Sequence, residues 1–261
     1  MKILFIGDIV GRVGRDIVKK KTKYFVEKYG IDFVIANGEN ATHGKGLIRH
    51  HYDELVDAGI DCITLGNHYD SKNEISRYID QVDNLIRPAN LVREYPGPGS
   101  SVFDVDGTLV RVISILGSAF ISEEVTSPYL KIKEILEGEQ IAINIIDFHG
   151  ESTSEKQCYG YAFDGKVSAI LGTHTHVQTK DVHVLPKGTG FISDVGMCGS
   201  KESVIGFTKE SVVQKIIFGD KAKFELSEND GGLYSAVVLN IDETTGLCKE
   251  IFPIYYQEDE K

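Results

Sequence analysis

The stretch KVSAILGTHTH, residues 166–176, joins an apolar run to a pair of histidines. Its apolar part, 167–171, is typical of a buried strand that ends at Gly172. His174 and His176 are two residues apart, so on an extended chain their side chains point to the same side. Two imidazoles side by side at a strand end favour a metal site, although two surface histidines in a loop would show the same pattern. The ends of the other predicted strands must therefore decide between these interpretations.

Three similar units open the chain, each an apolar run with a polar end. They are KILFIGD (2–8), FVIANGEN (33–40) and CITLGNHYD (62–70). Between them, apolar residues at helical spacing predict amphipathic helices over 13–26 and 48–56. Strands that alternate with helices in this way are typical of βαβ units. The first half is therefore predicted to form a parallel sheet covered by helices.

The second half is predicted to contain antiparallel strands as well. VFDVDGTLVRVISIL (102–116) has two β runs around Asp106-Gly107, a favoured hairpin turn pair. A helix is expected to begin at Pro128 and to end at Gly138. Further strands are expected over 141–150, 190–199, 222–226, 233–242 and 247–256.

Length and charge narrow the class of protein. The 261 residues contain no repeat and no clear linker, so we expect one domain over 1–261, with a frayed tail at 256–261. No run is long enough to span a membrane, and the first apolar run is too short for a signal peptide, which favours a cytoplasmic location. A net charge of −11 argues against binding to bulk nucleic acid or to an anionic membrane. A small anionic substrate stays compatible with this charge, because a metal ion can reverse the field inside a cleft.

Five predicted strands end in side chains that can hold a metal ion. In a parallel α/β sheet the carboxyl ends of the strands share one edge, so residues far apart in sequence can meet there. Each residue alone has an ordinary structural interpretation, such as a helix cap or a turn. Together they offer enough oxygen and imidazole donors for two metals, and these donors suit iron or manganese at least as well as zinc. The candidates are Asp8, Glu39, Asn40, Asn67, His68, His149, His174 and His176.

These residues resemble the motifs of the calcineurin-like metallophosphoesterase superfamily. In chain order the matching segments are GD (7–8), NGEN (37–40), GNH (66–68), His149 and GTHTH (172–176). The sequence departs from the superfamily in three ways: Val10 replaces a histidine, Glu39 replaces an aspartate, and the last motif begins Gly-Thr-His rather than Gly-His. These departures are similar to the YmdB-like branch, and so are IRPANL (86–91) and FISDVGMCG (191–199).

The resemblance implies a four-layered α/β/β/α metallophosphoesterase sandwich with two mixed sheets. It also implies two divalent metal ions, with iron preferred and manganese as the alternative. The implied ligands of the first metal are Asp8, Glu39, Asn40 and His176, and those of the second are Glu39, Asn67, His149 and His174. Glu39 would bridge the two metals, whereas His68 would contact phosphate and protonate the leaving oxygen.

The implied activity is that of a metal-dependent phosphodiesterase on cyclic nucleotides, both 2′,3′-cyclic and 3′,5′-cyclic. A hydroxide that bridges the metals would attack phosphorus, and His68 as imidazolium would donate a proton to the ribose oxygen that leaves. The expected partner is a small phosphodiester, and formation of a homo-oligomer stays open. Two alternatives are a metal-binding regulatory protein with vestigial hydrolysis, and a phosphomonoesterase or nucleotidase on the same scaffold.

One motif points to a different class of phosphatase. DVDGTLV (104–110) matches the DxDGT motif of haloacid-dehalogenase-type phosphatases, in which the first aspartate is the nucleophile. That nucleophile follows the first strand of a parallel sheet, whereas Asp104 follows a Pro/Gly loop and precedes another β run. We therefore expect a hairpin turn at Asp106-Gly107.

Overall fold

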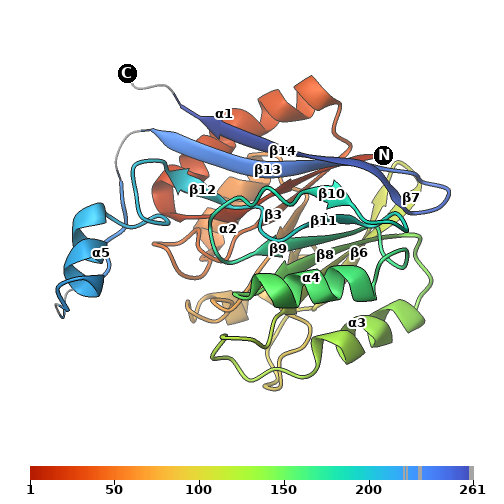
Figure 1. The fold of residues 1–261 in the computed structure, drawn as a ribbon, viewed down its shortest axis with the longest axis horizontal. Coiled ribbons are helices and arrows are strands. Elements are labelled where there is room, and N and C mark those ends of the chain that lie inside the picture. Colours follow the sequence, from red (N-terminus) through yellow and green to blue (C-terminus); the bar gives the residue numbers. More distant parts are fainter. Residues whose placement is uncertain (220, 222, 229–230, 259–261) are drawn as a thin grey trace.

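Two β-sheets packed face to face form the centre of the molecule (Figure 1). The computed structural model describes residues 1–219, 221, 223–228 and 231–258. Within these residues the first sheet has eight strands, in the order β2 (Asp8–Ile9), β12 (Met197–Ser200), β13 (Gly232–Ile241), β1 (Lys2–Ile6), β3 (Phe33–Asn37), β4 (Cys62–Thr64) and β5 (Leu85–Ile86), with β14 (Cys248–Gln257) paired to β13. The second sheet, over the same described residues, has six, in the order β10 (His183–Val184), β11 (Gly190–Ile192), β9 (Ala169–Thr173), β8 (Ile143–His149), β7 (Thr108–Leu116) and β6 (Ser100–Val105).

Both sheets are mixed, as the resemblance implied. In the first, β1 is parallel to β3 and antiparallel to β13. In the second, β7 is parallel to β8 and antiparallel to β6. The parallel strands of each sheet are those that carry the predicted ligands, so their carboxyl ends point the same way within each sheet.

Alternation of side chains along the central strands creates the layers. In β1, Leu4 packs beneath the outer helices, whereas Ile3 faces the second sheet. In β8, Ile145 faces the first sheet, whereas Ile146 packs beneath helices on the opposite side. Because successive side chains of a strand point to opposite faces, a strand buried on both faces is apolar throughout. This explains why the predicted strands are continuous apolar runs.

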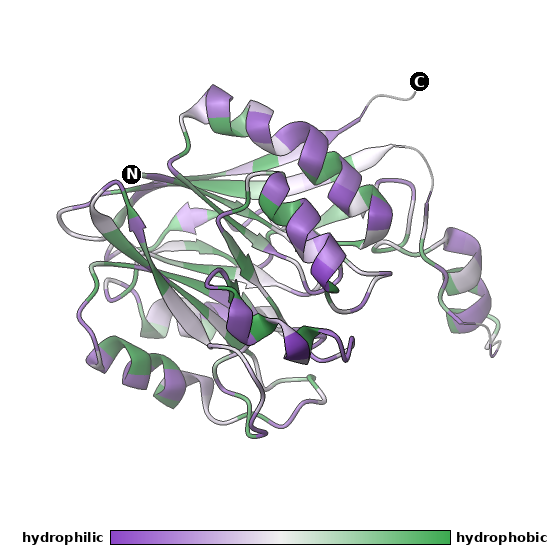
Figure 2. Cartoon of the chain, turned by 180° about the vertical axis from the view of Figure 1, so that it is seen from behind, coloured by the Kyte–Doolittle hydropathy of each residue, from purple (hydrophilic) through white to green (hydrophobic). Residues whose placement is uncertain are grey.

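Helices cover the outer faces of the two sheets. The first sheet carries α1 (Gly11–Tyr29) and α2 (Arg49–Asp57), and the second carries α3 (Pro128–Glu137) and α4 (Thr153–Ala162) (Figure 1). Figure 2 shows hydrophobic strands enclosed between helices that turn hydrophilic sides outward. The predicted α/β/β/α sandwich is therefore confirmed. In the part of the chain that the structure describes, no helix has the length and apolar character needed to cross a membrane.

The hairpin at Asp106-Gly107 is confirmed. Both residues have positive φ, 51° and 88°, as a tight turn between antiparallel strands requires. The carboxylate of Asp104 accepts a hydrogen bond of 2.7 Å from the amide of Gly107. Asp104 thus lies near the end of strand β6, at the edge of the second sheet, and its side chain stabilises the turn. It is not the nucleophile of a haloacid-dehalogenase-type site.

Two predicted elements are corrected by the structure. Residues 223–226 of the predicted strand 222–226 form no strand, and residue 222 lies outside the described residues. Leu226 makes only an isolated bridge to Phe207, and its side chain packs against a separate small cluster. The predicted frayed tail begins too early, because Tyr256 and Gln257 pair with β13 in strand β14. Residues 259–261 of that tail lie outside the described residues.

Candidate metal centre

The predicted metal-binding side chains come from both sheets. Asp8 begins β2, and Glu39 and Asn40 follow β3 in the first sheet. His149 is the last residue of β8, and His174 directly follows β9 in the second. The sequence alone predicted a single shared edge of one parallel sheet. Instead, strand ends of two sheets meet, because the sheets pack face to face and bring their ligand-bearing ends together.

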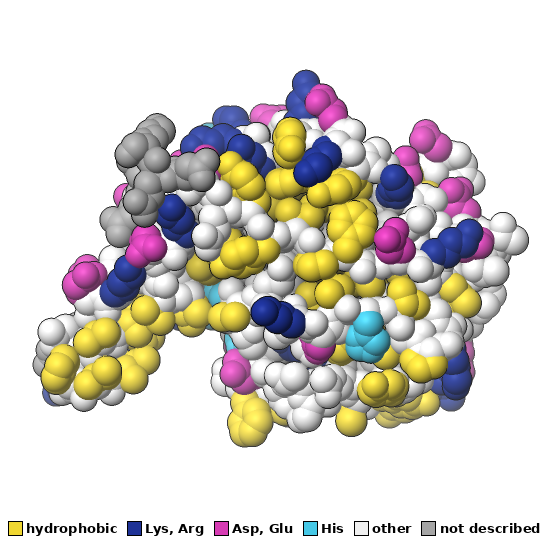
Figure 3. Space-filling model, turned by 45° about the horizontal axis from the view of Figure 1, so that its top comes forward, with side chains coloured by type: hydrophobic (Ala, Val, Ile, Leu, Met, Phe, Trp, Pro, Cys, Tyr) yellow, Lys and Arg dark blue, Asp and Glu magenta, His cyan; other side chains and the backbone are white. Residues whose placement is uncertain are grey.

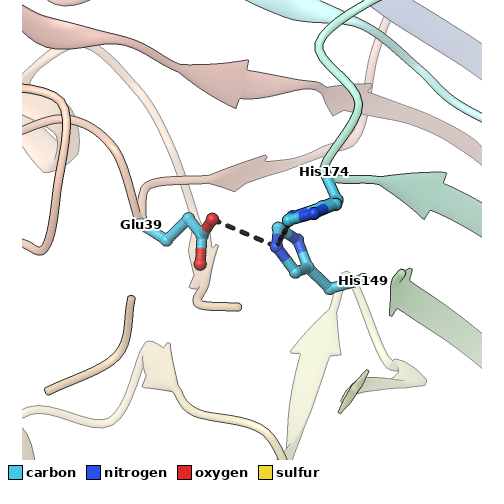
Figure 4. A group of neighbouring side chains, drawn as sticks. All are labelled: Glu39, His149 and His174. Atoms are coloured by element: carbon cyan, nitrogen blue, oxygen red, sulfur yellow. Dashed lines mark hydrogen bonds and ion pairs between the residues drawn. The ribbon is translucent and has the colours of Figure 1, made fainter. Parts of the chain in front are cut away.

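Three side chains converge on Nε2 of His149, so that four potential ligand atoms meet there. This nitrogen lies 2.9 Å from Oδ1 of Asn67, 3.1 Å from Oε1 of Glu39 and 3.0 Å from Nδ1 of His174. Figure 4 shows the Glu39 carboxylate and the His174 ring directed at His149. A single proton can satisfy only one of these close contacts, whereas a cation can accept lone pairs from all four atoms. The donor set, with one carboxylate, one amide and two imidazoles, fits a divalent metal.

A second group lies around the carboxylate of Asp8, which is fully buried. Its Oδ2 accepts a hydrogen bond of 3.1 Å from the amide of His174, but its Oδ1 has no hydrogen-bond partner within the described residues. Oδ1 lies 3.9 Å from Nε2 of His176, which in turn is 3.2 Å from Nδ2 of Asn40. A buried carboxylate oxygen without a partner carries a large desolvation cost, which a bound cation would offset. This group therefore also fits a divalent metal.

The two histidines of GTHTH contact different neighbours. His174 lies against His149, whereas His176 lies against Asn40. Both residues have positive φ, 105° and 67°, so the chain leaves the extended conformation directly after β9. The expectation that both side chains share one side of an extended chain is therefore wrong. That the two histidines bind different metals stays a prediction.

A buried ion pair holds the backbone of this strained loop. Nζ of Lys156, in α4, donates to the carbonyl of Thr173 at 2.9 Å and lies 2.8 Å from Oδ2 of Asp194. The same Oδ2 accepts a hydrogen bond of 2.9 Å from the amide of Thr175. Lys156 and Asp194 are each only 1% exposed. The pair therefore fixes the peptide units on both sides of His174, and sequence reasoning missed both residues.

A second buried network orients His149 from behind. The carboxylate of Asp147 accepts hydrogen bonds from Nδ2 of Asn37 at 2.9 Å, from the Thr64 hydroxyl at 2.5 Å and from the Thr173 hydroxyl at 2.6 Å. The Thr173 oxygen also lies 2.8 Å from Nδ1 of His149. Because the only hydroxyl proton of Thr173 goes to Asp147, its oxygen must accept the proton of Nδ1. Nδ1 is therefore protonated, and Nε2 is the nitrogen that faces the other ligands.

The charges of the site favour an ion pair between Glu39 and His149. Burial by itself would raise the pKa of Glu39, but the nearby His149 lowers it below its ordinary value. Burial would lower the pKa of His149, and Glu39 overrides this and raises it. In the protein without metal these charges favour a proton on Nε2 of His149, at the position where the ligands converge. A metal ion at this position must displace that proton.

His68 faces the same cavity as the predicted ligands. Its amide donates to Oε2 of Glu39 at 2.9 Å, while its half-buried side chain lines a cavity of about 350 Å³. Burial lowers the pKa of the His68 imidazole below its ordinary value. Glu151, which sequence reasoning missed, lines this cavity too, with Oε2 3.2 Å from Nε2 of His174. The site thus combines a metal-ligand cluster with a nearby imidazole that does not belong to the cluster.

Comparisons with known proteins agree with this geometry. The family model described as YmdB-like protein matches residues 4–254. The chain is 42% identical over 261 residues to the 2′,3′-cyclic-nucleotide 2′-phosphodiesterase of Bacillus subtilis strain 168, covering 99% of this chain and 98% of that protein. A crystal structure described as a novel phosphatase from Mycoplasma pneumoniae matches with a TM-score of 0.94 and 37% identity, over 100% of this chain and 94% of that one. A hypothetical protein from Thermus thermophilus matches with a TM-score of 0.93 and 34% identity, over 99% and 100% of the two chains. The chain therefore belongs to the YmdB-like family of the calcineurin-like metallophosphoesterases.

Proposed function

We propose that this protein hydrolyses 2′,3′-cyclic nucleotides with two divalent metal ions bound between its sheets. Its family makes it an enzyme that acts on phosphoric esters, and the similar protein of Bacillus subtilis is named for this substrate. The observation that carries the proposal is the convergence of Glu39, Asn67 and His174 on Nε2 of His149. Carboxylate, amide and imidazole ligands without a thiolate favour iron, with manganese as the alternative.

The two groups of ligands would hold one metal each. Asp8, Asn40 and His176 would bind the first, and Asn67, His149 and His174 the second. Glu39 would serve both, because its Oε1 lies 3.1 Å from His149 and 3.2 Å from Nδ2 of Asn40. Two such metals, when bound, would supply an activated water near neutral pH and would offset the charge of the phosphate group.

His68 would supply the proton that the leaving group needs. Burial lowers the pKa of His68, which favours the neutral imidazole in the protein without substrate. The negative charge of a bound phosphodiester favours the imidazolium, so binding of substrate would load the proton. In the reaction, water adds to phosphorus, the bond to one ribose oxygen breaks, and His68 donates its proton to that oxygen. If the bond to O2′ breaks, the product is a nucleoside 3′-phosphate.

The proposal includes the setting in which the enzyme works. All four cysteines are free, which fits a reducing compartment such as the cytoplasm. The net charge of −11 disfavours long nucleic acids, whereas a small diester meets mainly the local charge of the metals. The substrate comparison below tests hydrolysis of 3′,5′-cyclic nucleotides, and formation of a homo-oligomer stays a prediction.

The test is to purify the protein without added metal, to determine its metal content, and to compare 2′,3′-cyclic AMP, 3′,5′-cyclic AMP, bis(p-nitrophenyl) phosphate and p-nitrophenyl phosphate as substrates. We expect Glu39→Gln to lose bound metal and turnover together. His68→Ala should keep its metal and lose about 100-fold or more in kcat. His50→Ala is the matched control, because His50 is an exposed histidine of α2. Normal turnover of Glu39→Gln would contradict the proposal, and preference for the monoester would favour a phosphomonoesterase.

A further inference from the structure

A lobe around α5 stands out from the two-sheet body. We define the α5 lobe as the described residues of 201–227, with α5 (Lys209–Ile216) at its tip. Figure 1 shows it projecting beside the body, and Figure 3 shows hydrophobic side chains on its surface. None of the predicted metal ligands belongs to this lobe. Its position next to the cavity therefore requires a separate explanation.

The base of the α5 lobe is attached to the metal centre itself. Nδ1 of His176 donates to the carbonyl of Ile205 at 2.9 Å, which leaves Nε2 of the same ring for Asn40 and Asp8. Leu226 packs against the small cluster of Val10, Met197 and Leu233, and Val10 lies directly after β2. The lobe is therefore fixed relative to the ligands, and its inner surface has a defined place in the cavity.

The lining of the cavity of about 350 Å³ combines two chemically different kinds of side chain. Its polar lining includes the predicted ligands Glu39 and His176 together with His68. Its aromatic lining consists of Phe207 and Phe224 of the α5 lobe. Small-molecule sites combine such apolar surfaces with a few polar groups, and this volume lies within their usual range. With metals bound, a ligand that suits this lining has an anionic group at the predicted ligands and an apolar group at the phenylalanines.

The side chain of Phe224 is accessible to a ligand. The rings of Phe207 and Phe224 lie 5.4 Å apart between centroids at an angle of 40°. Phe224 is 41% exposed, whereas core residues such as Phe5 and Phe148 are fully buried. Nζ of Lys215 lies over the Phe224 ring, 4.3 Å from its centroid, in a cation–π contact. Exposed aromatic surface is unfavourable in water, so contact with a planar apolar group would stabilise a complex here.

We infer that Phe224, packed against Phe207, is the nucleobase-binding residue of this enzyme. The base of a cyclic nucleotide stacks on the Phe224 ring, while its phosphate lies at the predicted metal ligands that line the same cavity. This inference rests on the proposed function, because it assigns the second half of the same substrate. Stacking tolerates every base, since every base has a π face. The enzyme is therefore expected to accept all four nucleosides and to need the base for tight binding.

The experiment compares a substrate with a base and one without. Kinetics are measured for Phe224→Ala on 2′,3′-cyclic AMP and on 1-O-methylribose 2′,3′-cyclic phosphate. We expect kcat/KM for cyclic AMP to fall about tenfold or more, mainly through KM, because base–aromatic stacking is lost. The base-free substrate should be hydrolysed as by the unmodified protein. Phe224→Trp should retain the preference for cyclic AMP.

A matched control lies on the same lobe. Phe218 is 68% exposed and does not line the cavity, so Phe218→Ala should change neither substrate. Metal content and melting temperature are measured for each variant, to show that the centre and the fold are intact. An equal loss on both substrates, or no loss on either, would overturn the inference about Phe224. If the unmodified protein hydrolyses the base-free diester but not cyclic AMP, both the inference about Phe224 and the assignment of a nucleotide substrate fail. Inactivity of the unmodified protein on both would contradict the proposed function itself.

Discussion

The hydroxyl of Thr173 accepts the proton of Nδ1 of His149 at a distance of 2.8 Å, and donates its own proton to Asp147. This relationship fixes the imidazole in the form whose Nε2 faces Glu39 and His174. Asp147 also accepts from Asn37 of the first sheet, while Thr173 belongs to the second. One buried carboxylate thus sets the orientation of a predicted ligand and connects the two sheets behind the site.

Replacing Thr173 by valine should weaken metal binding without removing any predicted ligand. Valine keeps the shape of the side chain but cannot accept from Nδ1, so the ring loses its preferred tautomer. We expect affinity for Mn²⁺, measured by titration calorimetry, to fall about 10- to 100-fold. Thr173→Ser should retain the affinity, because it keeps the hydroxyl. Unchanged affinity in Thr173→Val would show that Asp147 does not act through this hydroxyl.

Removing Lys156 should destabilise the fold strongly. Lys156→Met leaves the carboxylate of Asp194 buried and without its cation, which typically costs about 3–5 kcal/mol. Urea unfolding in the presence of a chelator measures this loss independently of metal. Lys133→Met breaks an exposed ion pair with Glu137 and should change stability by less than about 1 kcal/mol. Similar values for the two variants would contradict the importance of the buried pair.

The stability of the protein should decrease as the pH is lowered, because of His51. Burial, followed by the nearby Arg15, lowers the pKa of His51 to about 4, against 6.5 for an unperturbed histidine. Between these values the unfolded chain binds one proton more than the folded protein, so the stabilisation is complete above pH 6.5 and is lost as pH falls towards 4. The neutral ring lies 2.7 Å from the hydroxyl of Thr42, which can donate to its Nδ1.

The expected loss from this histidine, with allowance for screening by solvent, is roughly 1–3 kcal/mol between pH 7 and pH 4. It is measured as the difference in unfolding free energy between the unmodified protein and His51→Gln across that range. The exposed neighbour His50 serves as control, and His50→Gln should leave the pH dependence unchanged. Equal pH dependence in the unmodified protein and in His51→Gln would contradict the prediction.

Metal binding should stabilise the protein through Asp8. At a free metal concentration 100 times Kd, a ligand that binds only the folded state adds about 2.7 kcal/mol to the free energy of unfolding. Addition of Mn²⁺ should therefore raise the melting temperature, and a chelator should reverse the effect. Asp8→Asn should reduce the gain, because it removes the charge of the buried carboxylate. Asp104→Ala, in the hairpin of β6 and β7, should keep both the full gain and phosphodiesterase activity.

Local patterns predicted the strands and the candidate ligands because each follows an apolar run. Ile3 and Leu4 illustrate this, since a strand buried on both faces has no polar interruption until its end. Asp147 was missed although a signal exists: it lies two residues before His149 on the same strand, and side chains at that spacing share a face.

Other features depend on tertiary contacts that no local pattern contains. Lys156 resembles an ordinary surface lysine of a helix, and only the packing of α4 against β9 buries it beside Asp194. The positive φ values of His174 and His176 follow from hydrogen bonds to residues far along the chain. Phe224 lies in a segment that the sequence predicts as a strand, because its apolar residues alternate with charged ones. This pattern cannot show that Phe224 lines the cavity while Leu226 packs against a separate cluster.

The span of the site along the chain determines when metal can be acquired. Asp8 accepts from the amide of His174, and Asn40 contacts His176, so the site needs residues near both the beginning and the middle of the chain. During synthesis an N-terminal portion that ends before His176 contains only part of the ligand set. Contacts of such long sequence separation form late in folding, because closing long loops costs entropy first. If the proposed metals bind, their uptake is expected to report completion of this part of the fold, and a chain that ends before His176 is expected to lack metal-dependent hydrolysis.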